Sequence, residues 1–373
     1  MDTFSRFVKA FLISLVDEAA QATEPSLAPA LQVVVSECFN VQIILSGDPQ
    51  QLGPSITSGE ASSSGLSLSL MERLALHSYY KNANAPFVTL CQNYRSHPAL
   101  LMMPSALFYF KDLEPCRKKK KEEDISYFTR TPSYSYTKIP QLKELPHIDS
   151  KWPFLFYPVR GTEKHGYLEN ILTAGWFNPE EALVILTLVQ RMIRNIGDAI
   201  IDEIGIMTVS RRQVVHLRSI FREADLSKIN IGTVEDYQGM ERKYIFLSTV
   251  RVSDSFVDQD ISKNFGLVEQ NKRLNVALSR AQDLMIIVGS PKHLWRDTLW
   301  KQLFFFLDRN GLWIHQADKE DDVQFSGFEE LRVKPNLLSN SAIGKQKITN
   351  SYNILVSDLE RHFREKTNLH FGG

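Results

Sequence analysis

Seven short apolar runs constrain the fold of this 373-residue chain more than any other feature. Each run is continuous rather than alternating, and each is rich in Val, Ile, Leu or Phe. Strands that are buried on both faces have this pattern, because helices cover both sides of the sheet that contains them. The predicted strands are therefore residues 11–16, 41–45, 154–159, 204–209, 229–234, 244–250 and 284–288.

Helical patterns separate these strands. Residues 178–196 begin with a good N-cap, Asn178, then a proline suited to the first turn and two carboxylates at the positive end of the helix dipole. Residues 211–224 place apolar side chains on one stripe and charges opposite them. Strands that alternate with helices predict an α/β fold with parallel sheets.

The length of the chain allows about two domains. We expect a partial first domain at residues 1–78 and a complete second domain at 79–316, with an insertion at about 114–150 and a tail at 317–373. The segment 57–69 is rich in Ser and Gly, which predicts a loop or hinge that leads out of the first domain.

The insertion carries the basic run Arg117-Lys118-Lys119-Lys120-Lys121, followed by three acids and a stretch rich in Tyr, Ser and Pro. A run of like charges is usually solvated, and we interpret this one in that way. Contact with a phosphate backbone is the alternative. The tail gives no chemical signal beyond one short amphipathic segment at residues 352–363.

Composition narrows the classes of protein. The formal net charge is zero, so any nucleic-acid site must be a local groove rather than a basic surface. The three cysteines, Cys38, Cys91 and Cys116, form neither a zinc pattern nor a disulfide framework, which favours a reducing compartment. No apolar run approaches the roughly 20 residues of a membrane span.

Two acidic residues, Asp17 and Glu18, follow the first predicted strand. A carboxylate at the tip of a buried strand is costly unless a cation meets it there. In phosphoryl-transfer sites the Asp holds Mg²⁺, and an adjacent Glu polarises the attacking water. Taken alone, an Asp-Glu pair after an apolar run more often marks a strand that ends in a solvated loop.

The second predicted strand runs into Ser46-Gly47-Asp48-Pro49-Gln50-Gln51-Leu52-Gly53-Pro54. Gln51 can both donate and accept hydrogen bonds, so it can contact a terminal phosphate oxygen and the attacking water. Gly47 lets the backbone approach closely, and the two prolines stiffen the turn. The alternative is a Pro/Gly turn with a structural glutamine.

A third motif is Gln92-Asn93-Tyr94-Arg95-Ser96-His97-Pro98. Arg95 could supply positive charge to a phosphoryl-transfer transition state, and Tyr94 could stack on a base. The alternatives are an ordinary helix start and, for Tyr94, a core aromatic residue.

Two further motifs lie in the second half of the chain. In residues 232–241 the glycine Gly239 permits a tight approach, and Glu241 is suited to hydrogen-bond a ribose or phosphate. In residues 271–281 the arginines Arg273 and Arg280 are seven apart, which predicts that they share one helical face and form a polyphosphate clamp. Surface salt bridges are the alternative for this pair.

Together these motifs resemble the superfamily 1 helicases of the Upf-like branch, and within that branch the Armitage/Mov-ten group of RNA helicases. The resemblance covers roughly residues 10–310. It is carried by residues 16–22, 46–54, 93–97, 176–182, 234–241 and 273–281.

The resemblance implies two RecA-like domains of the P-loop NTPase type, with ATP between them and single-stranded RNA across their top. It also implies Mg²⁺, ATP-driven translocation and unwinding, and action as a monomer. RNA-silencing proteins in cytoplasmic ribonucleoprotein granules are the partners it suggests, and no membrane is involved.

Residue by residue, the resemblance implies that Asp17 binds magnesium and Glu18 activates water. Gln51, Arg95 and Arg280 would sense the γ-phosphate. Tyr94 would border the adenine, and Glu241 would hold the ribose.

The chain departs from the family pattern in three places. Val209-Ser210 stands where relatives carry Pro-Tyr, which puts a nucleic-acid contact there in doubt, and Gln282 replaces a common lysine. The phosphate-binding loop Gly-x-x-x-x-Gly-Lys-Ser/Thr does not occur in the sequence. Without its amides and lysine, ATP would bind through the second domain and the arginines only.

We therefore expect a fragment, a truncated gene model or a degenerate paralogue that is not an active ATPase alone. Its first domain would keep only two strands, whose edges need cover. A catalytically inactive RNA-binding or scaffold module is a second hypothesis, and a DNA helicase of the same superfamily is a third.

Overall fold

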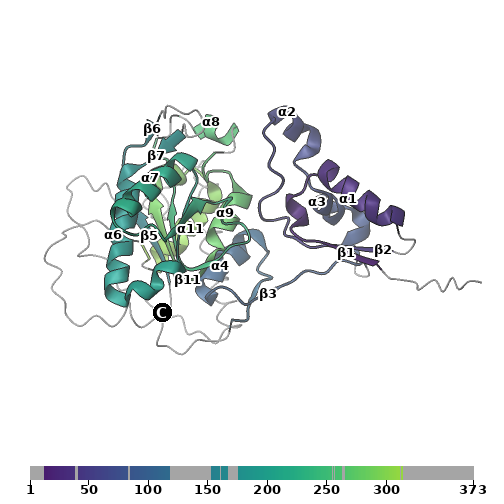
Figure 1. Ribbon diagram of the computed structural model, residues 1–373, viewed down its shortest axis with the longest axis horizontal. Helices are drawn as coiled ribbons and strands as arrows, with labels where there is room; N and C mark the ends of the chain where they lie inside the picture. Colours follow the sequence, from purple (N-terminus) through teal and green to yellow (C-terminus); the bar gives the residue numbers. More distant parts are fainter. Residues whose placement is uncertain are drawn as a thin grey trace, which may run out of the picture. The chain divides into compact units, whose positions relative to one another are not determined.

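The computed structural model describes residues 12–37, 41–82, 85–117, 153–159, 161–166, 175–253, 255, 257–262, 265–310 and 312–313. The chain divides into two compact units, Met1–Leu90 and Cys91–Gly373, which are drawn in Figure 1. The predictions for the lysines after Arg117 and for the segment 352–363 lie outside the described residues.

The first unit is built on a two-stranded parallel sheet. Strand β1 (Leu12–Val16) pairs in register with β2 (Val41–Leu45), and helix α1 (Glu24–Glu37) connects them. The remaining helical segments are η1 (Ala19–Gln21), α2 (Gly59–Ala61), η2 (Ser62–Leu66), α3 (Leu70–Leu76) and η3 (Ser78–Lys81). A sheet this small leaves apolar side chains in contact with solvent, and Leu15 is 65% exposed.

The segment 57–69 is more regular than predicted. Instead of an open loop it contains α2 and η2, so the loop prediction is wrong for Gly59–Leu66. The cause is capping: the Ser58 side chain accepts a hydrogen bond from the Ala61 N–H at 3.2 Å. Ser69 accepts one from the Glu72 N–H at 3.1 Å and begins α3. Serines placed before a turn favour a helix start as readily as a loop.

The second unit contains a five-stranded parallel sheet in the order β5-β11-β10-β8-β9. All seven predicted strands are confirmed, with ends that shift by up to three residues. The strands of this sheet are β5 (Phe154–Pro158), β8 (Ile204–Thr208), β9 (Asn230–Thr233), β10 (Arg242–Ser248) and β11 (Ala281–Gly289).

Helices and two short strand pairs surround this sheet. A parallel pair joins β3 (Gln92–Asn93) to β4 (Glu114–Pro115), and an antiparallel hairpin joins β6 (Lys164–Gly166) to β7 (Gly175–Phe177). The helices are α4 (Pro98–Phe108), α6 (Pro179–Ile196), η6 (Asp198–Glu203), α7 (Arg211–Glu223), α8 (Val257–Ser262), α9 (Asn271–Leu278), α10 (Pro291–Leu294) and α11 (Thr298–Arg309). None of the helices in the described ranges is long and apolar enough to cross a bilayer.

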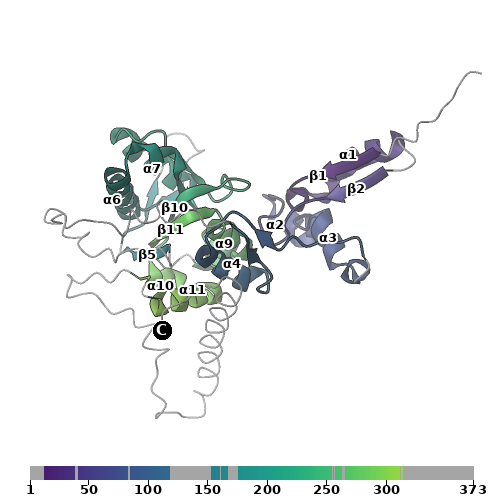
Figure 2. The same ribbon diagram turned by 90° about the horizontal axis from the view of Figure 1, so that it is seen from below.

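The central sheet is the middle of three layers, which Figure 2 shows most clearly. Leu155 and Tyr157 of β5 join the core beneath α6 and α7. Between them, Phe156 points to the other face, where its ring lies 4.9 Å from that of Phe304 on α11. Because successive side chains of one strand enter two different cores, the strand sequences are mostly apolar rather than alternating. The predicted α/β fold class is confirmed.

The start of α11 provides a test of this packing. Asp297 is buried, and its carboxylate accepts hydrogen bonds from the N–H groups of Leu299 at 2.6 Å and Glu269 at 2.5 Å. We expect Asp297→Ala to lower the free energy of unfolding by about 2 kcal/mol, because a cap is lost and a second N–H is left unsatisfied. Urea denaturation followed by tryptophan fluorescence measures this. The exposed Asp202→Ala is the control and should change stability by less than about 0.5 kcal/mol.

Candidate functional site

In the first unit, the loops that follow β1 and β2 are held side by side. The Ser46 N–H donates to the Val16 carbonyl, and the Ala19 N–H donates to the Ser46 carbonyl, both at 2.8 Å. A Cβ on Gly47 would come within 3.0 Å of the Ala20 nitrogen. A side chain at this position would crowd the neighbouring backbone, in keeping with the close backbone approach that the sequence predicts.

Three predicted site residues project from these two loops. Asp17 and Glu18 are exposed, and Glu18 adopts the left-handed conformation with φ 51°. The Glu18 carboxylate accepts a hydrogen bond from Gln21 Nε2 at 2.7 Å. Gln51 is half-buried, and its Nε2 donates to Asp48 Oδ2 at 2.8 Å. Each side chain is therefore oriented by its own loop.

The exposed carboxylate of Asp17 is compatible with a magnesium ion. Within the described ranges no group of three or more His, Cys, Asp or Glu side chains is arranged to hold a metal. Mg²⁺ does not need such a cage, because it usually keeps several waters and binds one or two carboxylates together with substrate phosphates. The single carboxylate of Asp17 therefore fits this mode of Mg²⁺ binding.

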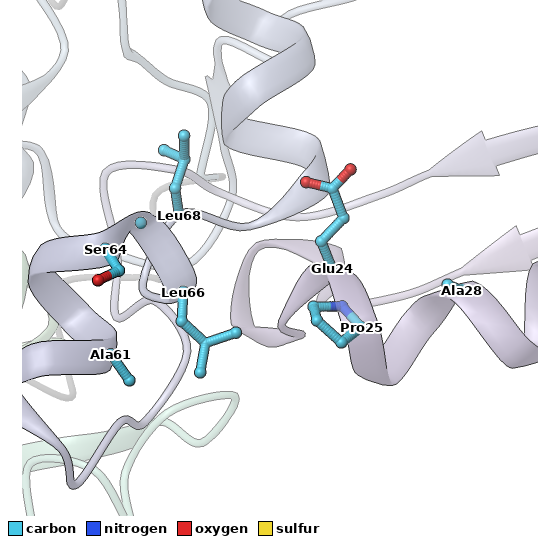
Figure 3. Close-up of a pocket in the computed structure, with 8 residues that line it drawn as sticks. Glu24, Pro25, Ala28, Ala61, Ser64, Leu66 and Leu68 are labelled. Carbon is cyan, nitrogen blue, oxygen red and sulfur yellow. The ribbon is translucent and has the colours of Figure 1, made fainter.

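The first unit also has a cavity of about 590 Å³, shown in Figure 3. It lies between the start of α1 and the α2–η2 turn and is lined mainly by small and apolar side chains. Glu24 at its edge is paired with Arg73, whose Nε donates to it at 2.9 Å. None of the predicted site residues lines this cavity.

In the second unit, the loop that precedes α4 is fastened to the start of β11. The Ser96 hydroxyl donates to the Ala281 carbonyl at 3.0 Å, and the His97 N–H donates to the Gln282 carbonyl at 2.8 Å. Asn93 Oδ1 accepts the Ser96 N–H at 2.9 Å and shapes the turn. Motifs far apart in sequence therefore lie against each other within this unit.

Arg117 also binds the start of β11. Its guanidinium pairs with Asp283 at 2.5 Å and donates to the Gln282 carbonyl at 2.6 Å. Both side chains of this ion pair are largely buried. The interpretation of the basic run as fully solvated is therefore wrong for its first residue.

Arg95 and Glu241 form an ion pair. Glu241 also accepts a hydrogen bond from Gln282 Nε2 at 2.6 Å, and Arg95 reaches the Ser279 carbonyl at 3.4 Å. Partial burial alone would raise the pKa of Glu241, but the hydrogen bond and charge of Arg95 hold that pKa below its usual value. Glu241 is therefore ionised at neutral pH.

Tyr94 is exposed, with 65% of its surface accessible. Its hydroxyl donates to Gln92 Oε1 at 2.6 Å, which holds the ring beside the loop. The alternative that Tyr94 is a core aromatic residue is wrong. Its exposed ring is free to stack on a planar ligand.

The prediction that Arg273 and Arg280 share a helical face is wrong. Helix α9 ends at Leu278, and Ser279 is its C-cap, so Arg280 lies outside the helix. Arg273 pairs with Glu235 and donates to the Gly266 carbonyl at 3.1 Å. Arg280 is 2% exposed and donates to the Ser279 hydroxyl at 2.8 Å. The helix stops because β11 begins at Ala281 and must pair with β10.

Gly239 has a backbone φ of 74°, in the region that favours glycine. A Cβ at this position would meet no atom within 4 Å, so it is the backbone conformation rather than close packing that requires glycine here. The tight approach that the sequence suggests at this glycine stays a prediction.

Glu181 lies in the first turn of α6, as the sequence predicts, but it also has a role inside the unit. Asn178 is the N-cap as expected, but the Glu181 side chain is fully buried. Its Oε2 accepts hydrogen bonds from the Ser248 hydroxyl at 2.6 Å and the Val250 N–H at 2.9 Å. Burial raises the pKa of Glu181 to about 8, although these donors act in the opposite direction. Val250 is held with a φ of 71°, an uncommon conformation for a β-branched residue.

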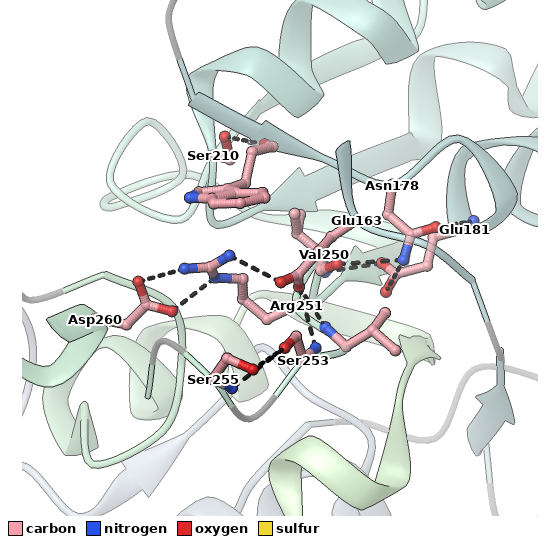
Figure 4. A network of polar contacts seen from close by, with 11 residues as sticks. Glu163, Asn178, Glu181, Ser210, Val250, Arg251, Ser253, Ser255 and Asp260 are labelled. Atoms are coloured by element: carbon pink, nitrogen blue, oxygen red, sulfur yellow. Dashed lines mark hydrogen bonds and ion pairs between the residues drawn. The ribbon is translucent and has the colours of Figure 1, made fainter. Parts of the chain in front are cut away.

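Sequence reasoning also missed a buried arginine, which Figure 4 shows at the centre of a polar network. Arg251 makes two hydrogen bonds of 2.6 Å to Asp260 and one of 3.0 Å to Glu163. Its guanidinium carbon lies 4.3 Å from the ring centre of Trp176. The network connects the end of β10 to α8 and to the β6–β7 hairpin. No local pattern marks this residue, because its partners come from distant loops.

Two polar residues at the start of α7, Ser210 and Gln213, form hydrogen bonds within the second unit. The Ser210 hydroxyl caps the helix and donates to the Trp176 carbonyl at 2.6 Å. Gln213 is buried and donates to the Asn178 carbonyl and the Ser248 hydroxyl, both at 3.1 Å. Neither polar group is free to contact nucleic acid.

A parallel sheet covered on both faces, preceded by acidic and glutamine loops at strand ends, defines an α/β protein of the P-loop NTPase type. Residues 66–292, more than half of the chain, match the family model of an AAA domain, and residues 2–59 match a second AAA domain model. The chain belongs to this family, the AAA domains of Upf1-like superfamily 1 helicases.

Curated relatives are helicases by name. The chain is 34% identical to RNA helicase Mov10l1 from Mus musculus over 80% of its own length and 24% of that protein. It is 34% identical to the probable RNA helicase armi from Drosophila melanogaster, with 79% and 25% covered. Helicase sen1 from Schizosaccharomyces pombe is 30% identical, with 79% and 15% covered. The chain thus spans about a quarter of the length of the first two relatives.

A solved structure, an arterivirus nonstructural protein 10 helicase, matches with a TM-score of 0.34 and 13% identity. That match covers 76% of this chain and 39% of the viral chain. A similarity of this size carries no argument about function.

Proposed function

We propose that the chain is the nucleotide- and RNA-contacting part of an RNA helicase, in which ATP hydrolysis drives movement along single-stranded RNA. The observation that carries the proposal is the contact between Arg95 and Glu241, which joins two distant motifs at one place beside Gln282. The helicase names of the relatives support the same reading. We further propose a cytoplasmic location and a role in RNA silencing.

In this proposal the first unit acts on the terminal phosphate and its water. Asp17 would hold Mg²⁺, which supplies positive charge to the phosphates, and Glu18 would take a proton from the attacking water. Gln51 would orient that water and contact the γ-phosphate. The exposure of both acids leaves them accessible to a ligand.

In the second unit, Tyr94 would lie against the adenine and Glu241 would accept hydrogen bonds from the ribose. Arg95 and Arg280 would contact the γ-phosphate, with Gly239 and Arg273 near the nucleotide. Because Arg95 and Glu241 neutralise each other, a nucleotide can use both only by replacing one charge-assisted contact with another. This exchange limits the affinity that either residue contributes.

Nucleotide binding tests these roles. We expect Glu241→Ala and Arg95→Ala each to weaken the binding of a fluorescent ATP analogue to the 373-residue chain by about tenfold or more, because each removes a charged hydrogen-bonding partner. Asp202→Ala, an exposed acid on η6, is the control and should bind like the unchanged chain. Equal affinity in all four proteins would contradict the assigned roles.

Nucleic-acid dependence separates the proposal from its alternatives. We expect ATP hydrolysis, where it is measurable, to respond to single-stranded RNA more than to single-stranded DNA. An equal response to both would favour a DNA helicase of the same superfamily. RNA binding without any nucleotide binding would favour a scaffold module.

A further inference from the structure

The Glu241 carboxylate is held by a different donor on each of its two oxygens. Arg95 Nε donates to Oε2, and Gln282 Nε2 donates to Oε1 at 2.6 Å. The terminal torsion of a glutamate is otherwise broad, so one contact would leave the carboxylate free to rotate, whereas two contacts fix its plane. The Glu241 side chain is 40% exposed, and the fixed carboxylate therefore remains open to a ligand.

The backbone of Gln282 is fixed as well. Its carbonyl oxygen accepts hydrogen bonds from the His97 N–H at 2.8 Å and from Arg117 Nη1 at 2.6 Å. A side chain that starts from so well fixed a backbone loses little further freedom when it binds Glu241. Gln282 is therefore suited to orient another side chain.

An irregularity in the pairing of β10 with β11 gives Gln282 its direction. The register is interrupted between two pairs of residues, Arg242 with Ala281 and Tyr244 with Leu284. Between these pairs β10 has one residue, Lys243, whereas β11 has two, Gln282 and Asp283. An extra residue of this kind breaks the alternation of side chains and re-aims them. Gln282 contacts Glu241 here, and Asp283 pairs with Arg117.

Each oxygen of the Glu241 carboxylate keeps one position for a further hydrogen bond. A carboxylate has about four such positions, two on each oxygen. Among the residues that the structure describes, only Arg95 and Gln282 donate to this carboxylate. Two adjacent acceptor positions, one on each oxygen, match the two adjacent hydroxyl donors of a ribose, O2′ and O3′.

We propose that Gln282 is a positioning residue that makes the nucleotide site select ribose over deoxyribose, by fixing the plane of the Glu241 carboxylate so that each oxygen accepts one ribose hydroxyl. The inference rests on the proposed function, which places the ribose at Glu241. A single hydroxyl needs only one acceptor, and a carboxylate that rotates freely offers one in any orientation. The second contact from Gln282 matters only when both hydroxyls are bound together.

Isothermal titration calorimetry of the 373-residue chain with Mg²⁺ and three ligands tests the proposal. The ligands are ATP, deoxy-ATP, which lacks the O2′ hydroxyl, and inorganic tripolyphosphate, which has no sugar. We expect the unchanged chain to bind ATP about tenfold more tightly than deoxy-ATP, because deoxy-ATP lacks one donor to a charged acceptor. Gln282→Met keeps the length of the side chain but removes its donor, and it should reduce this preference to about threefold or less. Affinity for tripolyphosphate should not change.

Three further variants separate positioning from folding. Gln282→Lys retains a donor and should keep most of the preference for ATP. Gln282→Glu keeps the length of the side chain but repels Glu241, and it should lose the preference as the methionine variant does. It tests the proposal even if Gln282→Met unfolds, which circular dichroism would reveal. Gln190→Met replaces a glutamine on α6 and is the control, with an unchanged preference.

The outcomes distinguish this inference from the proposed function. If the unchanged chain binds neither ATP nor deoxy-ATP, the proposed function fails and this inference fails with it. If the chain binds both with equal affinity, nucleotide binding stands and the ribose selectivity is overturned. If it prefers ATP but folded Gln282→Met and Gln282→Glu keep that preference, the ribose contact stands and only the role of Gln282 is overturned. A loss of tripolyphosphate affinity equal to the loss of ATP affinity would show a general structural role instead.

Discussion

Replacing Arg251 by methionine is expected to lower the free energy of unfolding of the second unit by about 3–5 kcal/mol. Arg251 is 1% exposed and is bonded to Asp260 and Glu163. Methionine would leave two carboxylates close together with little water to solvate them, and breaking a buried ion pair by removing one partner costs about this much. The Trp176 ring would also lose its cation.

A matched control is present on the surface. Arg211 makes the same bidentate ion pair with Asp236, with hydrogen bonds of 2.7 and 2.8 Å, but its side chain is 64% exposed. Arg211→Met should cost less than about 1 kcal/mol in urea denaturation. The triple variant Arg251→Met, Glu163→Gln, Asp260→Asn should recover part of the loss, because no unpaired charge remains. If Arg251→Met and Arg211→Met lowered the free energy of unfolding equally, burial would not determine how much an ion pair contributes to stability.

The strands could be predicted from sequence because their signal is local. A run such as 284–288 is apolar at every position, as expected for a strand that is buried on both faces. The N-cap at Asn178 could likewise be predicted from sequence, because a cap depends on residues within one helical turn. The loop prediction for segment 57–69 was wrong because the local signal there is ambiguous. Its serines favour both loops and helix starts, and the sequence does not determine which of the two forms.

The sequence could suggest which residues belong to the site, but it could not predict how their side chains are arranged or which partners they contact. Arg273 and Arg280 were placed on one helix by their spacing, yet pairing between β10 and β11 ends that helix at Leu278. The partner of Arg95 could not be predicted because Glu241 lies 146 residues away. Arg251 and Glu181 were missed because long-range contacts alone bury them, and a charged residue next to a strand usually predicts a solvated end.

Glu181 makes the stability of the second unit fall as the pH rises from about 4.5 to about 8. Its pKa is about 8 in the folded chain against a usual value of 4.5, so between these values the folded state holds a proton that the unfolded state has lost. The free energy of unfolding therefore decreases with pH across this interval, by about 1.4 kcal/mol per pH unit for one proton.

His97 acts in the opposite direction at lower pH. It is buried, and its pKa is lowered to about 4, chiefly by burial, with Asp283 opposing and Arg117 adding to that effect. The unfolded state binds the proton from 6.5 downward, so the free energy of unfolding rises with pH from about 4 to 6.5. The pKa of His216 is also lowered, and its effect is confined to the range below 6.5.

The two residues nearly cancel between pH 4.5 and 6.5, and only Glu181 acts between 6.5 and 8. We expect the free energy of unfolding to rise over the first interval only by the contribution of His216, and to fall by about 2 kcal/mol over the second, measured by urea denaturation at a series of pH values. Glu181→Gln keeps the shape of the side chain and should abolish the fall. His97→Asn retains a capping side chain for α4 and should extend the fall down to pH 4.5. A constant stability from pH 6.5 to 8 would mean that the hydrogen bonds from Ser248 and Val250 outweigh burial, and that Glu181 is ionised in the folded chain.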